Sequence, residues 1–216
     1  MTNRSTPPTF DENFREHFHD LLVWRRDVRE FRPDPVKDDI LDGCLQLACQ
    51  GPSVGNSQPW RFVHIRDQDR LNKLAHYFKD ENQKALSDYD GEDAAKYARL
   101  KLSGLREAPV QISVFADTNT TAGKGLGSRT MTETKVYSVI SAIQILWLSL
   151  RSHNIGLGWV SILPPDKMAG LMDVDENWVF VGHLCIGYPV EQTDIPDLVK
   201  KNWQKRLPMD RFLLQR

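Results

Sequence analysis

Three arginines surround one carboxylate in the stretch "RRDVREF", residues 25–31. Guanidinium groups bind phosphate bidentately, and a segment that follows a helix allows several of them to converge on one anion. Arg25, Arg26 and Arg29 therefore predict an anion site. The alternative is a solvated basic face in which these arginines pair with the carboxylates between residues 30 and 38. A further basic pair, Lys205 and Arg206 in "NWQKRLP", reaches the same anion if the C-terminal segment folds back.

A second polar stretch, "PSVGNSQPW" at residues 52–60, places Ser53, Asn56 and Gln58 around a glycine turn between a helix and a strand. Such a loop presents backbone N–H groups and small polar side chains to a planar ligand rich in heteroatoms. The alternative interpretation is a turn held by its own capping hydrogen bonds.

A third stretch, "GLGWVSIL", follows the longest apolar segment and contains Trp159 and Ser161. Its glycines, Gly156 and Gly158, predict a close approach of the chain to a ligand. Ser161 offers one hydroxyl group where the strand begins. A nucleophilic triad is not expected, because no His–Asp pair accompanies this serine in a hydrolase motif.

The overall charge gives no reason to expect nucleic acid or an anionic membrane as a partner, since 28 basic residues balance 29 acidic ones. Neither the three cysteines nor the six histidines have the spacing of a metal site, and no metal is expected. The N-terminal residues lack the apolar region of a secretory signal, which predicts a cytoplasmic protein.

The periodicity of the apolar residues predicts one α+β domain over residues 1–216. Predicted helices cover residues 12–24, 37–50, 68–86, 92–107, 135–153 and 165–172, and predicted strands cover residues 60–65, 108–117, 155–163 and 178–188. Polar residues interrupt the segment 135–153, which favours a buried core helix or a helix at a subunit interface over a membrane span. The partly apolar tail, residues 193–216, predicts an arm that wraps a second subunit in a homodimer.

In their order along the chain, "RRDVREF", "PSVGNSQPWRFV", "AIQILWLSLRSHNIGLGWVSIL", "LCIGYP" and "NWQKRLP" resemble the nitroreductase-like flavoproteins, and within them the BluB-type branch. The resemblance runs from about Phe10 to Leu207. It implies an α+β nitroreductase-like fold with a central mixed or antiparallel sheet flanked by helices. It also implies an intertwined homodimer that exchanges C-terminal arms and binds FMN at the interface.

In the BluB-type branch the flavin is a substrate, so the resemblance implies an oxidoreductase of the oxygenase type. Reduced FMN reacts with O2 and is fragmented to 5,6-dimethylbenzimidazole, the lower ligand of cobalamin (vitamin B12), and erythrose 4-phosphate. A separate flavin reductase would supply the reduced FMN. The helices in residues 68–107 would form a lid that covers the flavin and excludes water.

The resemblance also assigns roles to individual residues. Ordinary nitroreductases typically carry serine at the position of Asp27 and lack Ser161, so these two residues mark the flavin-fragmenting branch and are the expected catalytic residues. Asp27 would relay protons, with a pKa lowered by the arginines and raised by burial. Ser161 would hydrogen-bond the flavin and steer its oxidation. The implied FMN-binding residues are Arg25, Arg26, Asp27, Val28, Arg29, Ser53, Leu102, Trp159, Ser161 and Arg206.

Two other functions compete with this expectation. One is an NAD(P)H-dependent nitroreductase or flavin reductase that keeps FMN as a true cofactor beneath an open site. The other is a non-catalytic flavin-binding protein, in which an acid at Asp27 would have no use.

Overall fold

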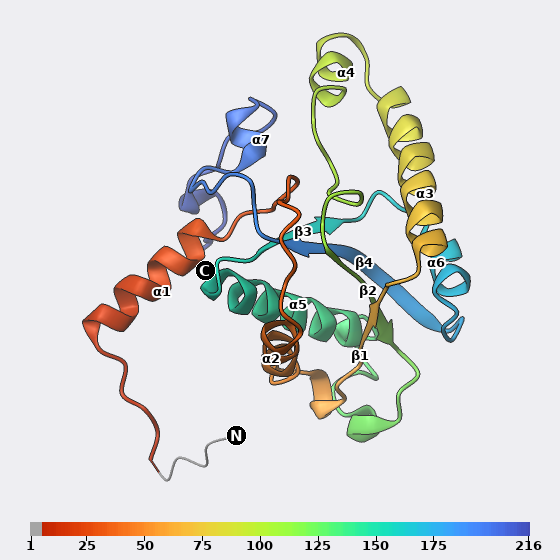
Figure 1. Cartoon of the computed structure of the whole chain (residues 1–216). Coiled ribbons are helices and arrows are strands. Elements are labelled where there is room, and N and C mark those ends of the chain that lie inside the picture. The colour runs from red at the N-terminus through yellow and green to blue at the C-terminus, as the bar shows by residue number, and fades with distance from the viewer. Residues whose placement is uncertain (1–5) are drawn as a thin grey trace.

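One antiparallel sheet organises the structure, a computed structural model that describes residues 6–216. Within these residues the sheet has four strands in the order β1-β2-β4-β3 (Figure 1). The strands are β1 (Trp60–His64), β2 (Val110–Asp117), β3 (Gly156–Val160) and β4 (Trp178–Gly187). The predicted strands are confirmed, and every strand pair is antiparallel.

Both faces of the sheet are covered, so alternate side chains of β2 and of the C-terminal half of β4 are buried on opposite sides. On one face, Ile112 and Leu184 pack against α2 (Asp38–Ala48) and α5 (Thr134–Ser152). On the other face, Phe115 and Cys185 pack against α3 (Gln68–Ser87), α6 (Pro165–Met172) and the segment that precedes β2. Figure 1 shows these helices on opposite sides of the sheet.

The long apolar helix α5 is a core helix, as predicted. Its residues from Val139 to Leu150 include the largest set of helical side chains in the main core cluster. The burial is incomplete, since Tyr137 and Ile140 remain exposed. In the part of the chain that the structure describes, neither α5 nor any other helix is long and apolar enough to cross a membrane.

The predicted helix over residues 92–107 is wrong in its extent, because α4 (Gly91–Tyr97) ends ten residues earlier. The chain from residue 98 to residue 109 forms coil and a turn instead. A side chain at Gly104 would overlap the ring of Phe31, and Gln111 binds carbonyl groups of the turn. These tertiary contacts override the local helical pattern.

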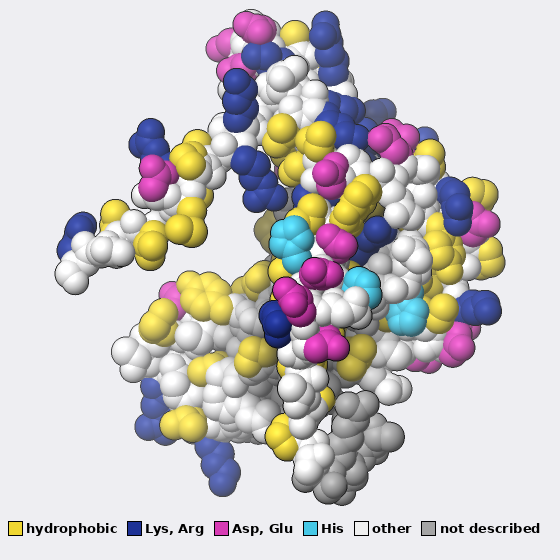
Figure 2. Space-filling model, turned by 90° about the vertical axis from the view of Figure 1, so that its left-hand side faces the viewer, with side chains coloured by type: hydrophobic (Ala, Val, Ile, Leu, Met, Phe, Trp, Pro, Cys, Tyr) yellow, Lys and Arg dark blue, Asp and Glu magenta, His cyan; other side chains and the backbone are white. Residues whose placement is uncertain are grey.

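The first helix, α1 (Glu12–Trp24), has an apolar face that its own chain does not cover. None of its residues is buried, and Phe14, Phe18 and Leu22 are exposed. Figure 2 shows hydrophobic side chains on this side of the molecule. The predicted N-terminal arm, residues 1–11, lies partly outside the described residues.

The C-terminal tail contains α7 (Asp197–Lys200) and a short turn, η3 (Met209–Arg211). Beyond residue 206 its apolar side chains are exposed, namely Leu207, Met209, Phe212, Leu213 and Leu214. Two further short turns, η1 (Val54–Asn56) and η2 (Ala122–Gly125), lie at the other end of the domain.

Candidate functional site

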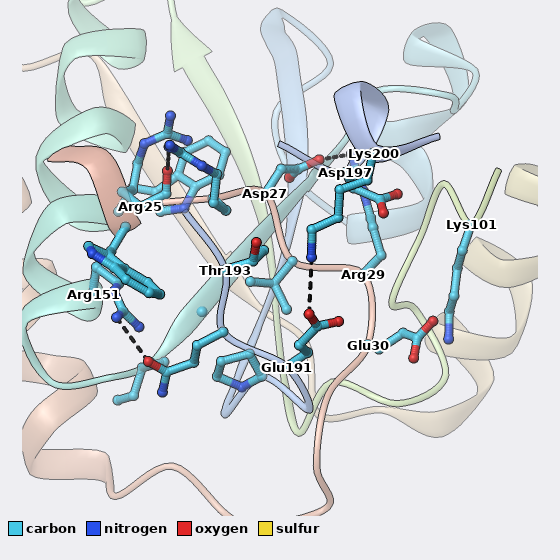
Figure 3. A pocket seen from close by; sticks show the side chains of 18 of the residues that line it. Arg25, Asp27, Arg29, Glu30, Lys101, Arg151, Glu191, Thr193, Asp197 and Lys200 are labelled. Carbon is cyan, nitrogen blue, oxygen red and sulfur yellow. Dashed lines mark hydrogen bonds and ion pairs between the residues drawn. The ribbon is translucent and has the colours of Figure 1, made fainter. Parts of the chain in front are cut away.

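The arginine segment lines a cavity of about 470 Å³ between α1, the end of α5 and the C-terminal segment (Figure 3). All residues from Trp24 to Glu30 contribute to its wall. Most of the remaining wall consists of charged or aromatic side chains: Lys101, Trp147, Arg151, Glu191, Asp197, Lys200 and Lys201.

Asp27 is fixed in this cavity by the edge strand β3. The backbone N–H of Val28 donates to the carbonyl of Leu157 at 3.1 Å, so the segment pairs with β3 like a short additional strand. The Asp27 Oδ1 atom accepts a hydrogen bond from the backbone N–H of Trp159 at 2.9 Å. Arg29 pairs with the same carboxylate and donates to the Trp159 carbonyl at 2.9 Å. The backbone N–H and carbonyl groups of Trp159 in β3 thus hold both charged side chains.

The pKa of Asp27 is raised above its ordinary value of 3.8, and burial is the largest cause. Arg29, the Trp159 N–H and Arg25 act in the opposite direction without reversing the shift. Both predicted influences are therefore present, and burial prevails. The side chain nevertheless retains 38% of its exposed area, so a bound molecule can reach it. A carboxyl group of this kind can accept and return a proton nearer to neutral pH than an ordinary aspartate.

The two glycines of β3 make room for the arginine segment. A Cβ atom at Gly158 would overlap the carbonyl oxygen of Val28, and a Cβ atom at Gly156 would overlap the side chain of Val28. The expected close approach at these glycines is made by Val28 within the chain, and the approach of a ligand stays a prediction. The close approach of Val28 allows Asp27 to reach Trp159.

Arg25, Arg26 and Arg206 lie near one another, as predicted for an anion site. Burial is the main reason that the pKa values of Arg25 and Arg26 are lowered, and the charge of Arg206 lowers both further. The guanidinium of Arg25 lies 4.6 Å from the centre of the Trp147 ring. Arg26 donates to the carbonyl of Asp194 at 2.8 Å.

Of the acids in the alternative interpretation, Glu30 lines the cavity, whereas Asp34 and Asp38 pair with arginines outside the cluster. Asp34 pairs with Arg32 at 2.9 Å, and Asp38 lies 3.6 Å from Arg66. Lowered arginine pKa values mean that neighbouring positive charges and burial outweigh the acids at this site. A dianion such as a phosphate would relieve that repulsion.

Five predicted residues do not line the cavity, namely Ser53, Leu102, Trp159, Ser161 and Arg206. Trp159 holds Asp27 and Arg29 through its backbone, and Arg206 acts on Arg25 and Arg26 through its charge. Ser161 is exposed just beyond β3, and Leu102 lies in the coil after α4, next to the cavity residue Lys101. Ser53 lies at the far end of α5, where its neighbour Val54 donates to Ser138 at 3.1 Å. Nine residues of helix separate Ser138 from Trp147, or roughly 13 Å. Within one chain Ser53 therefore holds its own loop, accepting from the Gln58 N–H at 3.1 Å.

Sequence reasoning missed Trp147 and Arg151 as cavity residues. They are four residues apart near the end of α5, so they share one helix face, and that face turns towards Arg25. The helical period was visible in the sequence, but the element against which this face packs was not. No cluster of candidate metal ligands occurs among residues 6–216.

The chain matches known proteins over nearly its whole length. Residues 22–188 match the Nitroreductase family model. The 5,6-dimethylbenzimidazole synthase of Rhodospirillum rubrum is 48% identical, with 94% of this chain and 96% of that protein covered. A 5,6-dimethylbenzimidazole synthase of Rhodobacter capsulatus is 39% identical, with 93% of this chain and 97% of that protein covered.

Solved structures share the fold at lower identity. A BluB-like flavoprotein from Clostridium difficile 630 has a TM-score of 0.67 and 18% identity, with 92% of this chain and 98% of that chain covered. An iodotyrosine deiodinase bound to FMN and 3-iodo-L-tyrosine has a TM-score of 0.68 and 21% identity, with 81% of this chain and 91% of that chain covered. Because the Nitroreductase family model matches residues 22–188, the chain belongs to the nitroreductase family.

Proposed function

We propose that this protein is a 5,6-dimethylbenzimidazole synthase, which uses O2 to fragment reduced FMN into 5,6-dimethylbenzimidazole and erythrose 4-phosphate for the lower ligand of cobalamin. The observation that carries the proposal is the 48% identity to a 5,6-dimethylbenzimidazole synthase over 94% of the chain. The position of Asp27, an acid held inside an arginine cluster, agrees with it.

The residues of the cavity suit FMN. Arg25 and Arg26 in the cavity wall, with the charge of Arg206 beside them, offer a cationic cluster for the phosphate group. The cavity volume of about 470 Å³ is in the range of small-molecule sites. Val28 and the backbone of Trp159 would contact the flavin along β3, together with Arg29 and Leu102. Reduced FMN supplies the electrons for O2 reduction and the atoms of the benzimidazole product.

Asp27 and Ser161 are the proposed catalytic residues. Asp27 has the raised pKa and partial exposure that suit an acid which accepts and returns protons while bonds of the substrate break. The Ser161 hydroxyl lies two residues beyond Trp159 and is exposed at the end of β3. There it can donate a hydrogen bond to the bound flavin and orient it towards O2.

The active form is proposed to be a homodimer in which each site uses both chains. The Ser53 loop of a second copy would reach the cavity that Ser53 of the same chain does not reach. Exposed apolar residues of α1 and of the tail beyond residue 206 would be covered in such a dimer. The exchanged arm is proposed for these last residues, within the segment 193–216.

The segment 68–107, which contains α3, α4 and the coil that follows them, is proposed to act as the lid. The rings of Tyr89, just before α4, and Tyr97, the last residue of α4, lie 5.5 Å and 6.1 Å from the ring of Trp203 in the C-terminal segment. This contact joins α4 to the C-terminal segment, which lines the cavity through Asp197 and Lys200, and it would hold the tip of the proposed lid near that side of the cavity. A closed lid would exclude water during the oxidation. A separate flavin reductase is proposed to deliver reduced FMN.

The test is an anaerobic reduction of the FMN-bound protein followed by admission of air. The wild-type protein should yield 5,6-dimethylbenzimidazole by chromatography, whereas Asp27→Asn and Ser161→Ala should return mainly intact, reoxidised FMN. Equal yields from all three proteins would reject the proposed roles. Rapid consumption of NADPH with a nitroarene, without the benzimidazole product, would instead identify a nitroreductase.

A further inference from the structure

A row of polar side chains crosses the buried face of β2 and β4. Gln111 and Ser113 lie on β2 directly opposite Cys185 and His183 on β4. All four side chains are at most 3% exposed. Buried polar groups are costly unless they are hydrogen-bonded, so a row of this kind in a small core needs a reason.

Each hydrogen bond of this row has a defined donor and acceptor. Burial lowers the pKa of His183 to about 3, so its ring is neutral and carries one N–H group. The Gln111 Nε2 atom donates to the carbonyls of Leu105 and Ala108 at 2.9 Å and 3.2 Å. The Gln111 Oε1 atom must then accept from His183 Nε2 at 2.6 Å.

The remaining nitrogen of His183 completes the relay. With the proton on Nε2, Nδ1 is an acceptor, and the Ser113 hydroxyl donates to it at 3.0 Å. The Cys185 thiol donates to the Gln111 Oε1 atom at 3.5 Å. Every member is satisfied, so the two N–H groups of the Gln111 amide are locked towards the turn at Leu105 and Ala108.

This turn forms the C-terminal end of the proposed lid. The N–H groups of Glu107 and Ala108 close it by donating to the Gly104 carbonyl at 3.2 Å and 3.0 Å. Gly104 presses against the ring of Phe31, which belongs to the arginine segment. Lys101, three residues earlier, lines the cavity. The position of the turn therefore sets where the lid leaves the sheet and how it meets the arginines.

The geometry points to Gln111 as a positioning residue that fixes the base of the lid over the cavity, with His183 and Ser113 orienting its amide. Gln111 does not contact the cavity itself, so it acts through the segment 101–108. The inference deepens the proposed function, on which its product readout rests. Its structural readouts, which are backbone exchange and FMN affinity, are independent of that function.

The test compares the full-length variants Gln111→Glu and Ser113→Ala with Val114→Ala as the matched control. Glutamate at position 111 can accept from His183, but it has one O–H donor when protonated and none when ionised, so it cannot donate to both carbonyls. Val114 lies on the same strand and faces the opposite core, so its truncation weakens the sheet without touching the lid base. Ser113→Ala removes only one oxygen at the far end of the relay.

Hydrogen exchange of the Glu107 and Ala108 amides is the first readout. The loss of at least one of the two hydrogen bonds in Gln111→Glu should accelerate this exchange about tenfold relative to the amides of β2 and β4. Ser113→Ala should give the same local pattern at about threefold, and Val114→Ala should accelerate the strand amides instead. A uniform loss of protection in the Gln111 variant would overturn the inference, because Gln111 would then serve core packing alone.

The second readout is the Kd for oxidised FMN, and the third is the ratio of 5,6-dimethylbenzimidazole to hydrogen peroxide formed from reduced FMN in air. Gln111→Glu should weaken FMN binding about tenfold and lower the ratio, whereas Val114→Ala should change neither. An unchanged Kd and ratio in Gln111→Glu would overturn the inference. If wild type forms no benzimidazole while exchange and Kd respond as described, the proposed function fails and the positioning role stands.

Discussion

Asp27 and Trp159 are 132 residues apart in sequence and are joined by a hydrogen bond of 2.9 Å from the Trp159 N–H to the Asp27 carboxylate. Arg29 pairs with the carboxylate and donates to the carbonyl of the same tryptophan. The acid of the site is thus held by strand backbone rather than by a flexible partner. Its location is as well defined as β3 itself, which is what a proton-transfer group requires.

The raised pKa of Asp27 predicts a pH-dependent cost to folding. The native state binds the Asp27 proton more tightly than the unfolded chain does, since burial raises the pKa above 3.8. Between the ordinary and the raised value, the unfolded state binds fewer protons, so stability falls as pH rises. Asp27→Asn should therefore be more stable than the wild type at pH 7.5, and this advantage should shrink towards pH 4.5. Urea unfolding midpoints across this range would check it, and an advantage that grows on acidification would contradict it.

The contact between Gly158 and Val28 predicts that even one added methyl group damages the site. In Gly158→Ala the new Cβ overlaps the Val28 carbonyl oxygen, which belongs to the backbone and cannot rotate away. The segment 27–29 must move from β3, which should destabilise the protein by about 1–3 kcal/mol. Product yield should fall at least tenfold because Asp27 loses its partner.

Two glycines without neighbours provide the control for Gly158→Ala. Gly43 and Gly170 lie within helices, and a Cβ atom at either would meet nothing within 4 Å. Gly43→Ala and Gly170→Ala should stabilise the protein by about 0.5–1 kcal/mol each in urea unfolding and leave product yield intact. If Gly158→Ala has the stability and the product yield of these controls, the close contact with Val28 is not needed for function.

Much of this architecture follows from local pattern, because helices and strands with a strong apolar period bury the faces that the period defines. The arginine cluster around Asp27 could also be predicted, because its members are neighbours in sequence. The residues that contact this cluster in the folded chain could not be predicted from the sequence. Trp159 and the Asp194 carbonyl reach it only after the chain has folded, and no spacing rule encodes such distances. The family resemblance, rather than periodicity, connected these stretches.

The misassigned segment after Tyr97 and the relay at Gln111 have one physical origin. The strand "VQISVFAD" looks like an ordinary buried strand, in which Gln111 and Ser113 stand out only as polar residues at alternate positions. Their carbonyl and imidazole partners come from residues 105, 108 and 183, which the strand pattern does not specify. The same hydrogen bonds hold residues 98–109 out of the helix that local propensity favours.

The cationic cluster predicts a difference between FMN and riboflavin, which lacks the phosphate. Arg25→Ala should weaken FMN binding about 10–100-fold, because a hydrogen bond to a charged group contributes a free energy of that order at a partly buried site. It should leave riboflavin binding nearly unchanged. Arg26→Ala should have a smaller effect, because its guanidinium already binds the Asp194 carbonyl. Fluorescence titration measures both ligands.

The control for the phosphate prediction is Arg66→Ala, which removes an exposed arginine that lies 3.6 Å from Asp38. It should bind both flavins like the wild type, since exposed ion pairs contribute little. Equal weakening of FMN and riboflavin in Arg25→Ala would contradict the assignment, and would place Arg25 at the ring rather than at the phosphate.

The aromatic contact at the lid tip predicts how tightly the site is closed during oxidation. The rings of Tyr89 and Tyr97 lie 5.0 Å apart, and Trp203 meets both of them edge-on. Aromatic pairs of this kind contribute about 0.5–1.5 kcal/mol each, so Trp203→Ala should raise the open fraction of the lid about tenfold. Reduced FMN would then be oxidised in contact with water, so more hydrogen peroxide and less benzimidazole should form. Trp203→Phe keeps a ring in place and should retain most of the product, whereas a Trp203→Ala protein with the wild-type ratio would show that the lid closes without this contact.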